Sequence, residues 1–262
     1  MDNALWVAKT GLEAQDTEMA ITANNISNAS TVGFKESRAE FSDLMYQNMG
    51  EAGAQTDQNV QNPTGLQVGT GVHLDGTVKN FSEGNPEQTG RQLDVMIQGQ
   101  GFLQVQQPDG TTAYSRNGSM TVDQNGNLVT QSGYQITPQI TIPQNATSIT
   151  IGKDGTVEAT VPGQAQAQSL GQITLATFIN PVGLKSLGGD LYGATTASGT
   201  PTVSNPGSGG VGTLLQGALE SSNVSIVNEL VKMIQIQRAY EMNSNAISIS
   251  NKMSEFLTNH VD

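Results

Sequence analysis

Cysteine is absent from this chain of 262 residues, and histidine occurs only twice. The first absence excludes disulfides, thiolate metal sites and cysteine nucleophiles. With only His73 and His260 available, a histidine-based catalytic triad or a metal site with several histidines is not easily built. Both histidines are therefore expected to be structural or exposed to solvent.

Charged side chains make up only 13% of the sequence and aromatic side chains only 5%. The 11 lysines and arginines stand against 23 aspartates and glutamates, which gives a formal net charge of -12. This charge disfavours nucleic acids and anionic membranes as partners, because both require a positively charged protein surface. The composition favours a modest core with much uncharged polar surface, as in turn-rich β structure.

Long apolar runs are missing as well, and no stretch approaches the length of a membrane span. The N-terminal sequence MDNALWVAKTGLEAQ lacks the cationic start and apolar core of a cleaved secretory signal. We therefore expect no cleaved signal peptide. If the protein works outside the cytoplasm, it must leave by a route that reads an uncleaved N-terminus.

The first 30 residues are predicted to contain a helix, because residues 4–27 lack proline and apolar side chains recur every seven residues. This spacing is typical of a coiled coil. A simpler alternative is an amphipathic helix lying on its own core. The repeating positions are Leu5, Leu12, Met19 and Ile26.

The C-terminal end is predicted to form a second, longer helix, since residues 225–257 contain neither glycine nor proline. At about 1.5 Å per residue it would span roughly 45 to 50 Å. Its apolar residues form two stripes, which implies more than one partner helix. The first stripe contains Ile226, Leu230, Met233, Tyr240 and Ile247, and the second contains Met242, Ala246, Ile249, Met253 and Phe256.

The polar surface of this second helix is nearly free of charge, whereas most exposed helices carry glutamate and lysine there. One interpretation is a surface without selection for charge. The other is a wall facing a conduit through which other chains pass. Under the second interpretation, the side chains facing the conduit would include Gln235, Asn245, Ser248 and Asn251.

Between the helices, the hydrophobic pattern alternates every two residues and indicates strands at 93–97, 102–106, 120–122, 128–130, 149–151, 156–161 and 173–179. Pro108-Asp109-Gly110, Asn125-Gly126 and Asp154-Gly155 are typical hairpin turns. The middle of the chain is thus predicted to be a mostly antiparallel β domain. Residues 47–65 and 194–212 lack periodicity and are predicted to be long loops, of which the first could serve as a hinge or docking arm.

One motif resembles the beginning of a calcium-binding loop, with Asp123, Asn125 and Asn127 at alternate positions. The sixth position is Leu128 instead of glycine, and the twelfth is Tyr134 instead of glutamate. The calcium interpretation therefore fails, and a hairpin turn explains the same residues.

Two further features could suggest catalysis or nucleotide binding. Gly99 and Gly101 form a pair, but the third glycine of a dinucleotide-binding fingerprint is missing. Asp94 lies within an apolar strand, where a buried carboxylate needs a cation such as Arg91 or Arg116. A structural ion pair is expected there rather than acid-base chemistry.

Residues 23–35, ANNISNASTVGFK, closely resemble the N-terminal signature shared by flagellar rod and hook proteins. Further blocks match the same family in family order at 6–15, 93–105, 114–134 and 217–247. The residues that match the family signature are Asn24, Asn25, Asn28, Thr31, Gly33, Phe34, Lys35, Gln237, Arg238, Ala239, Tyr240 and Asn243.

The resemblance implies an α+β fold in which the N- and C-terminal helices pair as a coiled-coil-like domain beside a central, mostly antiparallel β domain. We expect a helical terminal domain at 1–30 plus 223–262, a connecting arm at 31–71 with a long loop at 46–65, and a β domain at 72–222. The residues expected to form interfaces between copies are Leu5, Leu12, Met19, Ile26, Ile226, Leu230, Met233, Tyr240, Ile247 and Met253.

The resemblance also implies a structural subunit of the bacterial flagellar basal body, with no cofactor and no catalysis. Such a subunit is exported by the flagellar type III apparatus and forms a rigid helical tube around the export channel. Length and the 47–65 segment favour the distal rod over a proximal rod or hook subunit. Expected partners are copies of itself, proximal rod subunits, hook-side subunits and the periplasmic and outer-membrane bushing rings. A secreted β-rich adhesin and a secreted hydrolase are the alternatives from other classes.

Overall fold

The computed structural model describes residues 2–51, 55–57, 60–61, 64–164 and 166–259. The chain divides into two compact units. We call the first the helical unit, formed by Met1–Ser27, Ser37–Val78 and Ser225–Asp262, and the second the β unit, formed by Asn28–Glu36 and Lys79–Val224. The predicted α+β class is confirmed.

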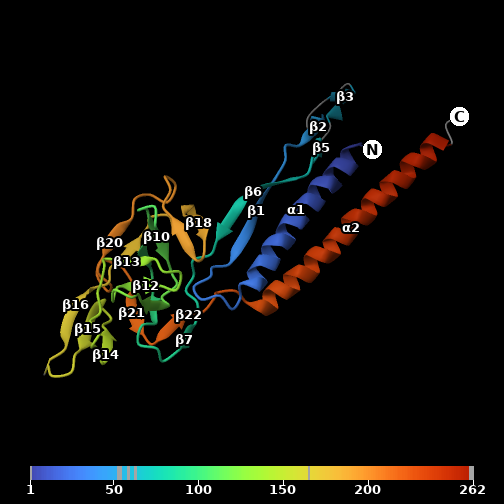
Figure 1. The fold of residues 1–262 in the computed structure, drawn as a ribbon. Helices are drawn as coiled ribbons and strands as arrows, with labels where there is room; N and C mark the ends of the chain where they lie inside the picture. Colours follow the sequence, from blue (N-terminus) through green and yellow to red (C-terminus); the bar gives the residue numbers. More distant parts are fainter. Residues whose placement is uncertain (1, 52–54, 58–59, 62–63, 165, 260–262) are drawn as a thin grey trace. The chain divides into compact units, whose positions relative to one another are not determined.

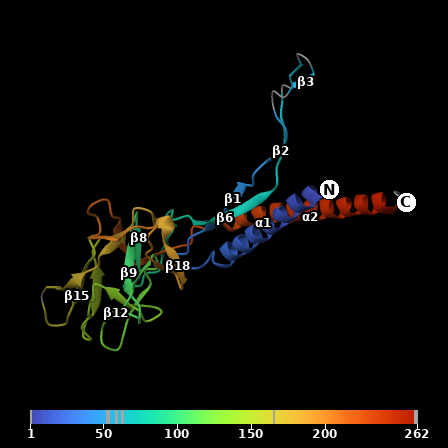
Figure 2. The same cartoon turned by 90° about the horizontal axis from the view of Figure 1, so that it is seen from above.

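The helical unit is built around two long helices, α1 (Asp2–Ser27) and α2 (Ile226–Asn259). They run antiparallel and lie side by side in both views (Figures 1 and 2). Both predicted helices are therefore confirmed. Gly11 is the one glycine of α1, and a Cβ atom there would lie 3.0 Å from the amide nitrogen of Asn243 on α2. The missing side chain thus lets the two helices approach closely at this point.

A two-stranded antiparallel ribbon completes the helical unit, and its first strand packs on α1. Its strands pair β1 with β6, β2 with β5 and β3 with β4. The bounds are β1 (Ser37–Asp43), β2 (Gln47–Gly50), β3 (Gln55–Asp57), β4 (Val60–Gln61), β5 (Leu66–Val68) and β6 (Val72–Lys79). Figure 2 shows β2 and β3 away from both helices.

The ribbon corrects the prediction of a long loop at 46–65, because strands occupy much of that segment. The side chains of β2 and β5 are mostly exposed on both faces, so the alternation of buried and exposed residues that identifies a strand is missing. The division into units also differs from the expected domain boundaries. Residues 37–71 belong to the helical unit with β6, and residues 28–36 belong to the β unit.

The β unit is organised around a nine-stranded sheet with the order β11-β12-β13-β9-β10-β19-β18, to which β17 and β20 are added through β9. The pairs β8–β21 and β7–β22 and the three-stranded sheet β14-β15-β16 accompany it. The first strands along the chain are β7 (Pro86–Gln88), β8 (Val95–Gln98), β9 (Phe102–Gln106), β10 (Thr112–Ser115), β11 (Met120–Val122), β12 (Leu128–Thr130), β13 (Gln135–Thr137) and β14 (Ser148–Ile151). The remaining elements are β15 (Thr156–Thr160), β16 (Gln168–Gln172), β17 (Leu175–Thr177), the 3-10 turn η1 (Pro181–Gly183), β18 (Lys185–Gly188), β19 (Leu191–Gly193), β20 (Thr202–Ser204), β21 (Thr213–Gln216) and β22 (Ala218–Glu220).

All seven predicted strands are found, and the strand pairing is antiparallel as expected. The predicted turns join β9 to β10, β11 to β12 and β14 to β15, with Gly110, Gly126 and Gly155 at positive φ. The hairpin interpretation of Asp123 is also confirmed, because its carboxylate accepts hydrogen bonds from the backbone of Asn125 and Asn127. Strand β20 lies within the predicted loop at 194–212, which is a correction.

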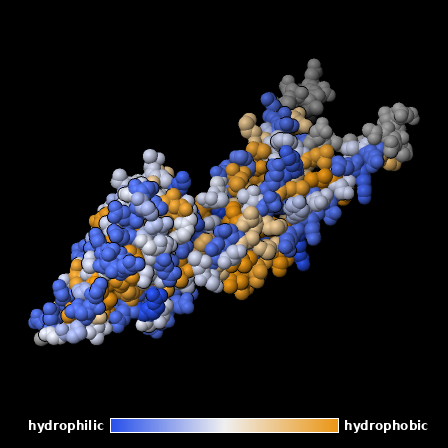
Figure 3. All heavy atoms as spheres, viewed as in Figure 1, coloured by the Kyte–Doolittle hydropathy of each residue, from blue (hydrophilic) through white to orange (hydrophobic). Residues whose placement is uncertain are grey.

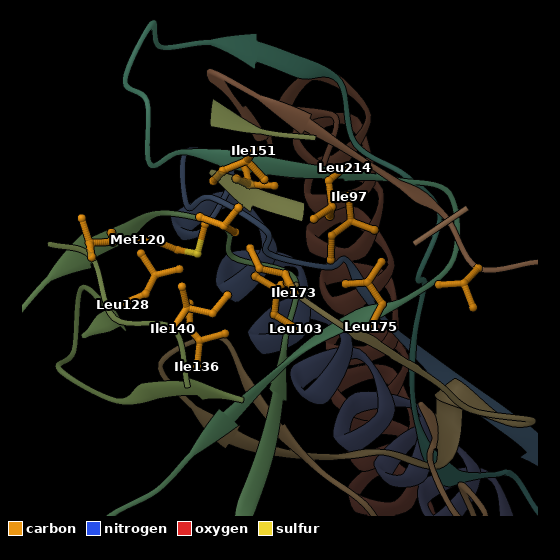
Figure 4. Close-up of a cluster of buried hydrophobic side chains, with 14 residues drawn as sticks. Ile97, Leu103, Met120, Leu128, Ile136, Ile140, Ile151, Ile173, Leu175 and Leu214 are labelled. Carbon is orange, nitrogen blue, oxygen red and sulfur yellow. The ribbon is translucent and has the colours of Figure 1, made fainter. Parts of the chain in front are cut away.

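The core of the β unit is mainly aliphatic, and its buried residues come from β8, β9, β11 to β15, β17 and β21 and from neighbouring loops (Figure 4). Ile97, Leu103, Met120, Ile173 and Leu175 are all nearly inaccessible to solvent. A second cluster is aromatic, with edge-to-face contacts between rings such as Phe102 and Phe178. Five of the twelve aromatic residues of the chain thus gather in this cluster.

Asp94 is buried as expected, and its ion-pair partner is Arg91, with 3.5 Å between the nearest nitrogen and oxygen. Arg116, the other expected candidate, pairs with Glu220. Among the described residues, no helix is long and apolar enough to cross a membrane. The described part of the chain also brings together no group of three side chains suited to hold a metal ion.

Candidate assembly surfaces

The seam between α1 and α2 is mainly polar. Glu18 forms an ion pair with Lys232 at 3.3 Å, and the Asn25 amide donates to the Glu229 carboxylate at 3.4 Å. Together with Gly11, these α1 residues are spaced by seven, as in a coiled coil. The seam of the single chain therefore uses polar and small residues where hydrophobic ones are usual.

Two further α1 residues continue the same face, Gln15 and Thr22. The side-chain oxygen of each is buried, and neither has a hydrogen-bond partner among the described residues. A buried polar atom without a partner costs about 1 to 3 kcal/mol. The pairing of α1 with α2 is consequently weak for two helices of this length.

The predicted heptad stripe of α1 does not form the centre of this seam. Leu12, Met19 and Ile26 each follow a seam residue by one position, which turns them about 100° around the helix. They are half-buried, as is Leu5. The apolar stripe therefore remains partly open, and its role between copies stays a prediction.

The outer face of α2 exposes a row of apolar side chains. Of the predicted interface residues, Ile226, Leu230, Tyr240 and Met253 are exposed, while Met233 and Ile247 are half-buried. Among the described apolar residues of α2, only Ile236 is buried. Sequence reasoning missed Ile236, together with three exposed residues at helical spacing, Val227, Val231 and Ile234.

We call Val227, Leu230, Val231, Ile234, Met242, Ile249 and Met253 the outer stripe of α2. The exposed fraction reaches 70% at Val227 and 66% at Met242. Figure 3 shows hydrophobic side chains gathered on the visible surface of the helical unit. Arg238, Glu241 and Asn245 interrupt the stripe, but exposed apolar residues grouped on one face in this way mark an interaction site.

The four residues predicted to face a channel are all exposed, but they do not share one face of α2. A continuous helix turns about 100° per residue. Asn245, Ser248 and Asn251 then lie within about 120° of one another, whereas Gln235 lies about 140° from Ser248. Only the first three can face one conduit together, which corrects the assignment of Gln235 to the same face.

The ribbon carries a second exposed apolar group. Met45 is 88% exposed, and Tyr46, Met49 and Leu66 are more than half exposed. All four lie in or beside β2 and β5, where the ribbon has no helix packed on it. The ribbon therefore presents apolar side chains that its own unit does not bury.

The family signature at the end of α1 contains a buried asparagine with a clear local role. The Asn25 side chain accepts a hydrogen bond from the Ser37 backbone NH at 3.0 Å and donates to the Ser37 carbonyl at 2.8 Å. Its amide also reaches Glu229 in the first turn of α2. Asn25 therefore ties the end of α1 to the beginning of β1 and α2.

In the turn that follows, Thr31 donates through its backbone NH to the Asn28 carbonyl and through its hydroxyl to the Asn28 side chain. Gly33 has a φ of 72°, a left-handed backbone conformation that glycine adopts readily. Asn24 is exposed at the end of α1. The Phe34 ring is half-buried, with the Lys79 ammonium 5.2 Å from its centroid.

Lys35 ends the signature inside the β unit. Its ammonium donates to the Glu220 carboxylate at 2.7 Å and to the Ser82 carbonyl at 2.5 Å. Arg116 approaches the same carboxylate at 2.9 Å, and its guanidinium also donates to three backbone carbonyls. All three charged side chains are buried, so this is an ion cluster of two cations and one anion.

The surroundings shift the pKa values in this cluster. Burial raises the pKa of the Glu220 carboxyl, but the hydrogen bonds and charge of Arg116, and then those of Lys35, outweigh it and hold the pKa below its usual value. Burial lowers the pKa of the Lys35 ammonium, and Glu220 offsets only part of this effect. The cluster acts as a structural device, since its charges are engaged with one another and with backbone carbonyls.

The remaining signature residues lie on α2. Gln237, Arg238 and Tyr240 are exposed, while Ala239 and Asn243 are half-buried toward the seam. Within the described part of the chain, the side chains of the exposed members form no hydrogen bond or ion pair. They are therefore available for contacts outside the chain.

A subunit with long terminal helices, a polar seam within the chain and an exposed apolar stripe belongs to the class of structural proteins that associate through their helices. Three family profiles match it in order. They are a flagella basal body rod protein profile at residues 5–35, a flagellar hook protein FlgE/F/G D1 domain at 96–159, and a flagellar basal body rod FlgEFG protein C-terminal profile at 215–259.

Similar proteins match over nearly the whole chain. The flagellar basal-body rod protein FlgG of Buchnera aphidicola subsp. Schizaphis graminum is 51% identical over 97% of this chain and 98% of its own length. FlgG of Caulobacter vibrioides is 46% identical over 95% of this chain and 96% of its own length, whereas FlgF of the same organism is 37% identical over 92% and 90%. The chain belongs to the FlgG family of flagellar basal-body rod proteins, which confirms the resemblance and its distal-rod assignment.

Proposed function

We propose that this rod subunit assembles with copies of itself into a rigid helical tube that transmits torque from the motor to the hook and encloses the export channel. The observation that carries the proposal is the outer stripe of α2. It presents apolar side chains along nearly the full helix, and the chain's own α1 lies on a different face.

The energetic argument favours burial of this stripe against other copies. Fully burying a valine, leucine, isoleucine or methionine contributes about 1.5 to 3 kcal/mol. A head-to-tail contact between copies that does not close into a ring produces a helical filament. Helices at both chain ends and a stripe that runs along α2 suit a tube whose inner layer consists of packed helices.

In this tube the helical units form the inner layer, and Ser248 and Asn251 supply an uncharged channel wall at the edge of the outer stripe. Asn245 lies within about 60° of Met242 and Ile249 around the helix, so it is covered together with the stripe. The β units form the outer layer inside the periplasmic and outer-membrane bushing rings. Proximal rod and hook-side subunits contact the two ends of the tube, and the flagellar type III apparatus delivers the chain without a cleaved signal. The subunit performs no catalysis in this role.

Polymerisation of the purified protein, followed by light scattering and electron microscopy, tests the proposal. We expect straight tubes above a critical concentration. Ile234→Glu should abolish them, because it places a carboxylate within the apolar stripe. Gln235→Glu is the matched control, since it introduces the same side chain at the next exposed position and should still polymerise. Normal tubes from Ile234→Glu would exclude the outer stripe as an interface.

A further inference from the structure

The chain passes between its two units four times, at residues 27/28, 36/37, 78/79 and 224/225. Three of the segments that lead to these points converge inside the β unit. They are residues 33–36, 79–84 and 220–223. Their contacts with one another are polar, and they range from the buried Lys35–Glu220 pair to the exposed bond between Asn223 and Asn80.

Backbone hydrogen bonds make the first connections among the three segments. The Gly33 NH donates to the Glu220 carbonyl at 2.8 Å, and the Asn80 NH donates to the Glu36 carbonyl at 2.8 Å. Each of the three segments is thereby linked to a neighbour before any side chain is considered.

Side chains from the first and third segments complete the connections. Lys35 donates both to Glu220 and to the Ser82 carbonyl. Asn223 accepts from the Glu36 NH at 2.8 Å and donates to the Asn80 carbonyl at 2.8 Å. Each segment therefore contacts both of the others.

The chemistry of these contacts favours geometric definition over stability. A buried ion cluster is often less stable than a well-packed apolar substitute, because its charges are removed from water. What it adds is direction, since hydrogen bonds tolerate only narrow distances and angles. Arg116 alone balances the negative charge of Glu220. The need to neutralise Glu220 therefore does not explain why Lys35 is also present.

We infer that Lys35, Glu220 and Asn223 form a positioning clamp, which locks together the three chain segments where they leave the β unit and so stiffens the connection that carries load in the assembled tube. The role in load transfer rests on the proposed function. The clamp itself is a property of the single chain and can be measured in the monomer.

Hydrogen exchange of the monomer provides the first test. In Lys35→Met we expect the amides of Gly33, Glu36 and Asn80 to exchange at least tenfold faster, while those of the central strand β9 keep their protection. Lys153→Met is the matched control, because it removes the same charge from an exposed site of the β unit. Unchanged exchange at the three amides in Lys35→Met would overturn the clamp.

Asn223→Ala is the second variant, since it keeps every charge in place and decides the matter if Lys35→Met fails to fold. We expect the same faster exchange of the Glu36 amide. In tubes, both clamp variants should have a shorter persistence length by electron microscopy than Lys153→Met. Faster exchange combined with unchanged persistence length would overturn the role in load transfer. Failure of the unaltered protein to form tubes would overturn the proposed function. The hydrogen-exchange results would still test the clamp, because they are measured in the monomer.

Discussion

At the scale of single residues, the buried ion cluster around Glu220 is sensitive to the loss of one of its charges. Lys35 and Arg116 share one carboxylate in a buried site, and Arg116 is further held by three carbonyls. Removing the anion leaves two buried cations without a counter-charge, and such a loss is severe.

Glu220→Gln should therefore destabilise the β unit by about 3 to 5 kcal/mol in chemical denaturation at neutral pH. Because the folded-state pKa of Glu220 lies below its unfolded value, its contribution is complete above the usual glutamate pKa and is lost as pH falls through the depressed value. The difference between the two proteins should thus shrink in acid. Glu158→Gln, at an exposed site of β15, should show neither effect.

Gly33 allows a second test at this scale. A Cβ atom at Gly33 would lie 2.9 Å from the Asn117 backbone nitrogen, and φ is 72°. Gly90 has a similar φ of 69° but no atom within 4 Å of such a Cβ.

We expect Gly90→Ala to cost about 1 to 2 kcal/mol from the left-handed conformation alone, and Gly33→Ala to cost clearly more because the neighbouring backbone must also shift. Thermal unfolding of both variants measures the difference. Equal losses would show that the contact with Asn117 relaxes freely.

The sequence predicted only part of what these residues do. The signature identified Gly33 and Lys35. The partner of Lys35 is Glu220, 185 positions away, and nothing in the local pattern connects the two. Arg116 was expected as a possible partner of Asp94, yet the fold brings it to Glu220 instead. Long-range pairing is decided by the tertiary fold.

At the scale of elements, periodicity predicted both helices but not the faces by which they meet. The sequence contains the heptad of Leu12, Met19 and Ile26, yet Gly11, one residue before Leu12, permits a close approach to Asn243 of α2. The seam is displaced accordingly toward Glu18 and Asn25. The hydrophobic pattern of the sequence does not specify which face of α1 meets α2, because both β1 of the ribbon and α2 pack on α1.

The polar seam leads to a stability prediction. The Thr22 hydroxyl is buried and has no hydrogen-bond partner among the described residues, so Thr22→Val should stabilise the helix pair by about 1 kcal/mol. Valine and threonine have similar shapes and helix propensities. Helix melting followed by circular dichroism provides the measurement.

Thr17→Val is the control, because the Thr17 hydroxyl already donates to the Glu13 carbonyl at 3.0 Å on an exposed part of α1. This variant should be neutral or slightly less stable. A loss of stability in Thr22→Val would mean that the hydroxyl has a partner in solution, such as a bound water, and would contradict a weak seam.

At the scale of the whole molecule, the regular hydrophobic patterns predicted the helices and the strands, and the family resemblance implied the pairing of the chain ends. The assignment of residues 37–71 was harder. Strands β2 and β5 are exposed and lack a buried face, so the pattern resembled a loop. Only the pairing across the ribbon, such as Gln47 with Val68, reveals the strands.

The last prediction concerns the straightness of the tube, which we assign to this ribbon. The ribbon exposes four apolar side chains that its own unit does not bury, namely Met45, Tyr46, Met49 and Leu66. If they pack on a neighbouring copy, they add lateral contacts that remove alternative packings, and bending needs interfaces that can slide between such packings. Deletion of residues 47–62, or Met49→Ser alone, should therefore give tubes that assemble but curve, with a shorter persistence length by electron microscopy. Asn48→Ser, at the adjacent exposed position of β2, is the control and should leave the tubes straight. Deletion tubes as straight and stiff as the unaltered ones would remove the ribbon from the explanation of rigidity.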